Sequence, residues 1–153
     1  MIVGDGPARS GLERAGPDAI FLGERRGDQL ARIYASLDVF VHTGPYETFG
    51  QTVQEALASG VPVVAPAAGG PLDLVDLVDH DRTGLLVPPS DAAAIASAAA
   101  LLAGDPGKRR RMGFAARAAV ERRTWPAVCD ELIQHYISVH SGGLAARPVE
   151  VPA

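Results

Sequence analysis

Residues 61–65, Val-Pro-Val-Val-Ala, form a nearly continuous apolar run dominated by β-branched side chains. A strand with one face in water alternates apolar and polar residues, so an unbroken run indicates a strand buried on both faces. Helices must then cover both faces of the sheet, and the strands must run mostly parallel. This segment therefore predicts a Rossmann-like α/β chain with a mostly parallel sheet and helices on both faces.

The rest of the chain fits this architecture, because short apolar runs alternate with helical patterns up to about residue 140. Asp28 is expected to cap the second helix and Gly60 to end the third. The expected strands are 2–3, 19–22, 39–42, 61–65 and 83–87. The expected helices are a short one to about 15, then 29–36, one from near 49 or 50 to 59, one near 72–78, and 91–102, 106–122 and 125–139. We expect one domain over residues 1–140 and a disordered tail, rich in Gly, Ala and Pro, over 141–153.

Charge and cysteine content exclude several functions. The formal net charge is -4 and the basic residues are not gathered on one face, so a nucleic-acid partner is not expected. Cys129 is the only cysteine, which rules out an internal disulfide and a thiol metal site and favours a reducing, cytoplasmic setting. The sequence Asp79-His80-Asp81 has the spacing of a metal-binding acidic pair, but Asp is common in turns and we expect a turn, not a metal site.

The segment with the most candidate ligand-binding residues is 46–60, where two glutamates lie close to the start of a helix. Glu47 lies in the loop before the helix, and Glu55 lies more than one turn inside it, at the border of the buried stripe. The helix start offers free backbone N–H groups, and Gly50 lets an anion approach them. A ligand with its diphosphate there could offer hydroxyls to Glu47 on one side and to Glu55 on the other, as a sugar and a ribose at its two ends would. A solvated glutamate pair beside an unspecified anion site remains an alternative on these grounds.

Two further features belong to the same edge of the sheet. The loop containing Gly69 and Gly70 follows the strand at 61–65 and should supply more accessible amides. His42 ends the strand at 39–42, where ligands of open α/β folds bind, so it is also a candidate.

The sequence ETFGQTVQEALASGVPVVAPAAGGPLDLV resembles the donor-site signature of the retaining glycosyltransferases of family 4, which have the GT-B architecture. The signature comprises Glu-x7-Glu, then Ala-x-Gly-x-Pro-Val-Val-Ala and a Gly-Gly loop. The resemblance extends from VGDGP at 3–7 to TGLLVPPSD at 83–91 and the closing helices. The wording VHTGPYETFGQTVQEALASG is most similar to actinobacterial lipid mannosyltransferases that use GDP-mannose.

The resemblance implies a role for each matching residue. Glu47 would hold hydroxyls of the transferred sugar, as the residue nearest the chemistry, and Glu55 would bind the ribose. Backbone amides at Phe49 and Gly50 would meet the diphosphate, with no metal or other cofactor. The implied donor site contains Gly23, Glu24 and Arg25 along the base, His42, Glu47, Thr48, Phe49, Gly50, Gln51 and Glu55, and Gly69 and Gly70 near the sugar.

The same resemblance implies that part of the enzyme lies outside this chain. Family members carry a basic pair that neutralises the leaving diphosphate, and an N-terminal acceptor domain, upstream of residues that match Met1. The chain is therefore expected to be the donor-binding half, inactive alone, of an enzyme that transfers a hexose with retention from GDP-mannose or a UDP-sugar. A lipid acceptor at the inner face of the membrane is left open. The alternatives are a non-enzymatic nucleotide-sugar binding module and one subunit of a split transferase.

Overall fold

The sheet consists of three parallel strands in the order β1-β2-β3: β1 (Phe40–Val41), β2 (Val63–Pro66) and β3 (Gly84–Val87). This computed structural model describes residues 1–44, 50–68, 78–121 and 123–141. Phe40 is paired with Val63, and Val63 with Gly84. All four residues of β2 are buried, which confirms the inference from the apolar run. The strand begins at Val63 because Pro62 has no N–H to donate, although the Pro62 carbonyl accepts from the Phe40 N–H (3.0 Å).

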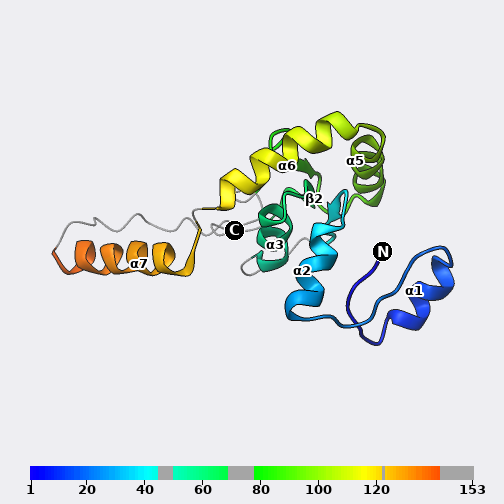
Figure 1. The fold of residues 1–153 in the computed structure, drawn as a ribbon, viewed down its shortest axis with the longest axis horizontal. Coiled ribbons are helices and arrows are strands. Elements are labelled where there is room, and N and C mark those ends of the chain that lie inside the picture. The colour runs from blue at the N-terminus through cyan, green and yellow to red at the C-terminus, as the bar shows by residue number, and fades with distance from the viewer. Residues whose placement is uncertain (45–49, 69–77, 122, 142–153) are drawn as a thin grey trace, which may run out of the picture.

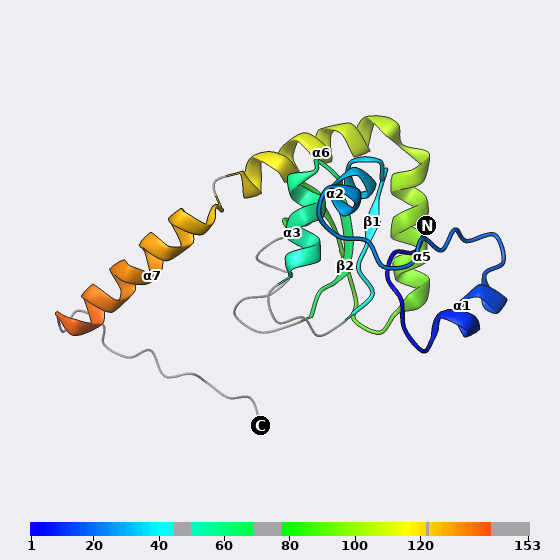
Figure 2. The same ribbon diagram turned by 60° about the horizontal axis from the view of Figure 1, so that its bottom comes forward.

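Helices cover both faces of the sheet, as expected (Figures 1 and 2). On one face, α2 (Gly27–Ala35) and α3 (Gln51–Ala58) pack over Val63 and Ala65 of β2. On the other face, α5 (Ala92–Gly104) packs over Val64. The long helix α6 (Pro106–Val120) contributes to both apolar clusters, Met112 to the second and Ala116 and Val120 to the first. Figure 2 shows α6 running from α5 past the sheet to α3.

The first 23 residues form less regular structure than expected. The strands expected at 2–3 and 19–22 are reduced to a single parallel bridge between Ile2 and Phe21. Between them lies α1 (Arg9–Ala15), which has no buried residue. The segment that comprises residues 1–23 lies at the margin of the domain in Figure 1.

The observed bounds of the helices agree with those expected from the sequence to within one or two residues, but one predicted cap is wrong. Asp28 was expected to cap α2, but the helix starts earlier: Arg26 occupies the N-cap and Asp28 lies in the first turn. The reason is Gly27, which enters the helix with a φ of +54°, a conformation that glycine adopts easily. The helix expected near 72–78 lies outside the described residues except at its end, where Val78 is buried.

The last helix, α7 (Trp125–His140), was expected from its apolar periodicity, and none of its residues is buried. Figures 1 and 2 both show it extending away from the sheet. Several of its apolar residues are exposed: Trp125, Leu132, Ile133, Tyr136, Ile137 and Val139. Among the helices of the described residues, none is both long and apolar enough to cross a bilayer.

Candidate functional site

The candidate site lies where the three parallel strands end. The loops after β1, β2 and β3 all leave the sheet at this carboxyl edge, which is where open α/β sheets bind ligands. His42 continues β1, since its N–H donates to the Val64 carbonyl (2.9 Å), and the residue is half-buried. Ala67 continues β2 by donating to the Val87 carbonyl (2.7 Å). His42 is thus placed at the edge where the sequence predicted it.

The start of α3 is shaped by Gly50. This residue is buried and occupies the N-cap in the left-handed region, with φ +67° and ψ +31°. It has no side chain that could cap the first amides of the helix, which begins at the exposed Gln51. Unsatisfied amides and the positive end of the helix dipole together favour an anion at this point. The predicted helix start is confirmed to within one residue.

The end of α3 fixes the helix on the sheet. Gly60, at φ +73°, donates its N–H to the Leu57 carbonyl (2.9 Å), and the Val61 N–H donates to the Ala56 carbonyl (3.0 Å). These two bonds form a Schellman motif, so Gly60 is the C′ residue that the sequence predicted. The chain then passes within a few residues into β2, so the end of α3 is held next to the sheet.

Glu55 lies on α3 next to the buried residues Val53 and Ala56, and is itself half-buried. On α2 lies Tyr34, whose pKa is raised to about 12, mainly by burial and in part by the charge of Glu55. The phenol therefore stays protonated at neutral pH. The influence of Glu55 on Tyr34 was not predicted from the sequence.

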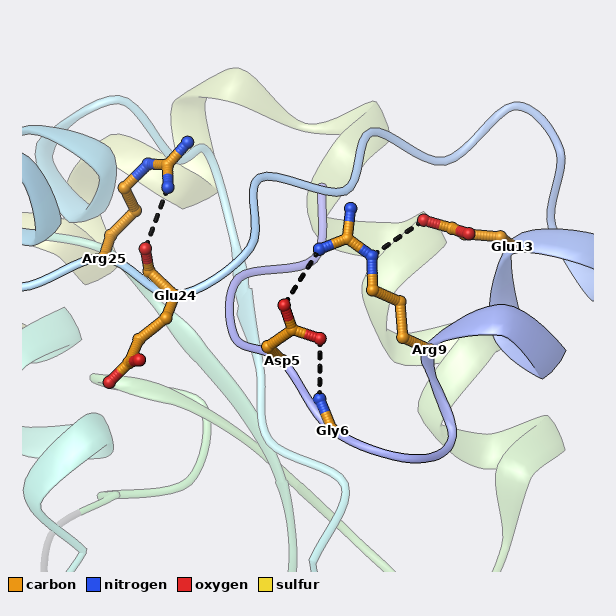
Figure 3. A network of polar contacts seen from close by, with 6 residues as sticks. All are labelled: Asp5, Gly6, Arg9, Glu13, Glu24 and Arg25. Carbon is orange, nitrogen blue, oxygen red and sulfur yellow. Dashed lines mark hydrogen bonds and ion pairs between the residues drawn. The ribbon is translucent and has the colours of Figure 1, made fainter.

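Gly23, Glu24 and Arg25 form a second part of the candidate site, ahead of α2. Figure 3 shows Glu24 and Arg25. Gly23 is buried at φ +68°, and its carbonyl accepts from the Gly4 N–H (2.9 Å). Arg25 donates to the Glu24 carbonyl (2.8 Å), whereas the Glu24 carboxylate accepts from Arg26 (Nε to Oε1, 2.7 Å). Glu24 and Arg25 are both exposed, so their side chains are accessible to a ligand.

Arg9 is a further cation in this region that sequence reasoning missed. A Cβ added to Gly23 would lie 3.3 Å from Arg9 Nη1 and 3.9 Å from Arg25 Nη1. Arg9 is held by Glu13 (Nε to Oε1, 2.8 Å) and Asp5 (Nη1 to Oδ2, 3.3 Å), as Figure 3 shows. The hydrogen bond to Glu13 contributes most to raising the pKa of Arg9. Asp5, Arg9 and Glu13 are spaced by four residues, which indicates ion pairs between neighbouring helical turns. That spacing does not indicate that Arg9 lies near Gly23.

The structure thus connects some of the predicted site residues and does not describe others. His42, Gly50, Gln51 and Glu55 belong to β1 and the helix that follows it. The segment at 23–25 leads directly into α2, which packs on α3. Glu47, Thr48, Phe49, Gly69 and Gly70 lie outside the described residues.

The acidic pair at Asp79 and Asp81 forms a turn, as expected. Arg82 pairs with Asp79 (3.0 Å) and Lys108 with Asp81 (2.6 Å), and this lysine lowers the pKa of Asp81. His80 accepts a hydrogen bond from the Leu86 N–H at Nδ1 (3.0 Å). Each of the three side chains is therefore engaged within the protein. Over the described ranges, no cluster of three or more His, Cys, Asp or Glu residues is placed to hold a metal ion.

A parallel sheet covered by helices on both faces, with a glycine-started helix at its carboxyl edge, defines a Rossmann-like α/β domain. Comparison with known proteins then gives its family. The chain belongs to the glycosyl transferases of group 1, whose family profile matches residues 1–105. The predicted fold class and the predicted family are both confirmed.

Individual relatives agree with this assignment. A GDP-mannose-dependent alpha-mannosyltransferase of Mycolicibacterium smegmatis is 57% identical over 141 residues, which cover 91% of this chain and 36% of that protein. The sucrose-phosphate synthase of Thermosynechococcus elongatus superposes with a TM-score of 0.78 at 33% identity, over 92% of this chain and 38% of the other. Anabaena HepE, solved in complex with UDP-glucose, superposes with a TM-score of 0.74 at 27% identity, over 89% of this chain and 40% of the other. The chain thus spans about a third of the length of the mannosyltransferase.

Proposed function

We propose that this chain is the donor-binding half of a retaining glycosyltransferase, which transfers a hexose from a nucleoside diphosphate sugar to an acceptor. The observation that carries the proposal is the start of α3, where the left-handed Gly50 leaves backbone amides uncapped and Glu55 lies little more than one turn further on. A diphosphate matches the amides, and a carboxylate matches neighbouring hydroxyls of a ribose. The UDP-glucose bound by the HepE relative supports a nucleotide sugar as the ligand.

Each candidate residue then has a defined task. Amides at Phe49 and Gly50 stabilise the charge that develops on the leaving diphosphate, which is the largest contribution a preorganised site can make. Glu47 holds hydroxyls of the transferred sugar and is the residue assigned nearest to the reacting carbon. Glu55 binds the ribose, and residues 23–25 lie along the base.

We assign the donor as GDP-mannose and the transferred sugar as mannose. Support comes from the 57% identity to a mannosyltransferase that depends on GDP-mannose. No metal ion takes part in this scheme, because the amides and the dipole of α3 meet the diphosphate charge. Removing divalent ions with EDTA is accordingly expected to leave the affinity for GDP-mannose unchanged, and a clear loss of affinity would contradict it.

The acceptor site belongs, in this proposal, to the part of the relatives that the chain does not cover. A lipid acceptor at a membrane surface is part of the proposal and rests on the likeness to lipid mannosyltransferases. The 153-residue chain is expected to bind donor without transferring sugar at a measurable rate. If transfer appears on adding the remaining two thirds of the relative as a separate polypeptide, a split transferase is favoured over a pure binding module.

Calorimetric titration tests the donor site directly. GDP-mannose, GDP and UDP-glucose are titrated into the parent chain and into Glu55→Ala, with Glu131→Ala on the exposed surface of α7 as the matched control. Loss of hydrogen bonds to a charged group should weaken GDP binding by about 1.5–3 kcal/mol, or roughly 10- to 100-fold. The control should bind like the parent chain. Equal affinity of Glu55→Ala and the parent chain would refute the ribose assignment.

A further inference from the structure

The outer edge of the sheet lies along β3, the last strand in the order β1-β2-β3 within the described ranges. The Val87 carbonyl faces β2, since it accepts from the Ala67 N–H (2.7 Å). Successive residues of a strand direct their backbone groups to opposite sides, so those of Gly84 and Leu86 face away from β2. An edge strand with free backbone groups can pair with a strand of another chain, and folded proteins usually protect such an edge.

The turn that precedes β3 folds back along this edge and supplies partners for it. The Gly84 carbonyl accepts from the Asp81 N–H (2.8 Å), and the Leu86 N–H donates to Nδ1 of His80 (3.0 Å). The next residue that would face outward is Pro88, which has no N–H to donate. The imidazole of His80 is thus the group that satisfies the outward N–H in the middle of the strand.

The backbone of His80 is held in a tight turn, whereas its ring is accessible to water. Thr83 is only 1% exposed, and its hydroxyl oxygen accepts from the Asp79 N–H (2.8 Å). The Thr83 N–H donates in turn to the Asp79 carbonyl (2.8 Å), and Asp81 between them has a left-handed backbone with φ +65°. His80 itself is exposed. Its ring is therefore fixed at the edge of β3 and can still exchange protons with solvent.

The bond from Leu86 requires an unprotonated Nδ1. A neutral imidazole has one donor and one acceptor nitrogen, so this bond places the proton of the neutral ring on Nε2. Protonation of Nδ1 would turn the acceptor into a donor that faces the Leu86 N–H, and the bond would be lost. Histidine is the side chain whose charge ordinarily changes between about pH 5 and 8, so this loss falls in an accessible range.

We propose that His80 is a pH-sensitive cap of the outer edge of the sheet: its neutral ring closes the edge at Leu86, and its protonation opens it. The charged groups around the turn are Asp79, paired with Arg82 (3.0 Å), Asp81, paired with Lys108 of α6 (2.6 Å), and Arg111 of α6, which lines a pocket with Asp81. The two ion pairs carry no net charge. Lys108 also lowers the pKa of Asp81, so this carboxylate does not titrate in the same pH range as an imidazole.

The bond to His80 has a second interpretation, in which it makes no difference to the edge because water satisfies the Leu86 N–H equally well. The two interpretations differ in how the Leu86 amide exchanges with solvent. If His80 caps the edge, acid removes protection from this amide beyond the change in its intrinsic exchange rate. If water serves equally well, the ratio of observed to intrinsic rate stays the same.

The test measures amide exchange at Leu86 by NMR in the parent chain, in His80→Asn and in His135→Asn, which alters an exposed histidine of α7. The protection of Leu86 in the parent chain should fall about two- to tenfold, the range of one neutral hydrogen bond, from pH 7.5 to 5.5. An asparagine oxygen can take the place of Nδ1 and does not titrate, so His80→Asn should remove this pH dependence. His135→Asn should behave like the parent chain. Protection that is independent of pH in the parent chain, or an equal fall in His80→Asn, would overturn the cap.

The nitrogen chemical shifts of His80 test the proposal without any substitution. At about pH 7.5 the ring should be neutral with its proton on Nε2, and protection of the Leu86 amide should be lost over the same pH range in which Nδ1 gains a proton. This measurement decides the matter if the asparagine variant fails to restore the bond and leaves Leu86 unprotected at both pH values. A proton on Nδ1 at neutral pH, or loss of protection in a different pH range, would refute the proposal.

Discussion

Gly113 in α6 lies directly against the carbonyl group of Gly60, the residue that ends α3. A Cβ added to Gly113 would be 2.2 Å from the Gly60 oxygen and 3.2 Å from its carbonyl carbon. Real side chains do not approach backbone so closely, so α6 meets the end of α3 at this point only because Gly113 carries no side chain. The contact fixes the end of the helix whose start forms the candidate nucleotide site.

Gly113→Ala is therefore expected to destabilise the domain. Forcing the methyl group into backbone that is already in contact should cost about 1–3 kcal/mol of unfolding free energy, measured by urea denaturation. Gly104→Ala is the control, because nothing lies within 4 Å of an added Cβ at the end of α5. The control should be neutral or slightly stabilising, since alanine favours the helix over glycine. Equal unfolding midpoints for the two variants would show that the close approach carries no strain.

Gly50→Ala should lose both stability and ligand binding. A left-handed backbone costs a residue with a Cβ about 1–2 kcal/mol. Gly27 offers a matched control, because its φ of +54° brings a similar penalty while open space surrounds an added Cβ. Both variants should unfold at lower urea concentration, and only Gly50→Ala should also bind GDP more weakly, since its Cβ would stand at the proposed diphosphate position. Unchanged GDP affinity for Gly50→Ala would argue against an anion at the start of α3.

Arg109→Lys tests a contact between three segments. Arg109 Nη1 donates to the carbonyls of Leu102 (2.7 Å) and Ala103 (2.6 Å) at the end of α5, and Nη2 donates to Asp38 (3.3 Å) before β1. A lysine ammonium cannot span this fork, so we expect a loss of about 1–3 kcal/mol by urea denaturation. Arg110→Lys, on the exposed side of the same turn, should leave stability unchanged. The interpretation would be wrong if both variants unfolded at the same midpoint.

The raised pKa of Tyr34 predicts a loss of stability in alkali. An unfolded tyrosine ionises near pH 10, whereas Tyr34 in the folded chain has a pKa of about 12, for which burial is the main cause. Below about pH 10 both states keep the proton and the stabilisation is complete. Between about pH 10 and 12 only the unfolded state releases it, so stability falls as the pH rises. Urea denaturation across this window should show a smaller fall for Tyr34→Phe than for Tyr136→Phe, and parallel curves would contradict the shift.

The features that the sequence predicted correctly are those set by local chemistry. The unbroken apolar run identified β2 as buried on both faces, and Gly60 ended α3 because a left-handed C′ position favours glycine. The wrong prediction of an Asp28 cap was also local: the helix starts at Gly27, two residues sooner than expected, and helix starts that differ by one or two residues differ little in free energy.

The features that could not be predicted depend on which distant segments meet. Periodicity can place Tyr34 on the buried side of α2, but it does not say that Glu55 lies near enough across the interface to raise the pKa of Tyr34. Two cations of α6 show the same dependence: Lys108 reaches Asp81, and Arg109 reaches the end of α5 and Asp38. Long cationic side chains find such partners only once the helices are packed.

The parallel pairing of the strands has a consequence for folding during synthesis. Phe40 pairs with Val63, and Val63 with Gly84, so neither pairing in the described sheet is a hairpin that can close as it is synthesised. During synthesis β2 is complete once Pro66 has been added. Its neighbour β3 is complete only at Val87, and Gly113, which packs against the end of α3, is added later still. At about 5–20 residues per second, a fully apolar strand waits roughly 2–10 s for these partners. Aggregation competes with folding during that interval, and the nucleotide site is completed only after it ends.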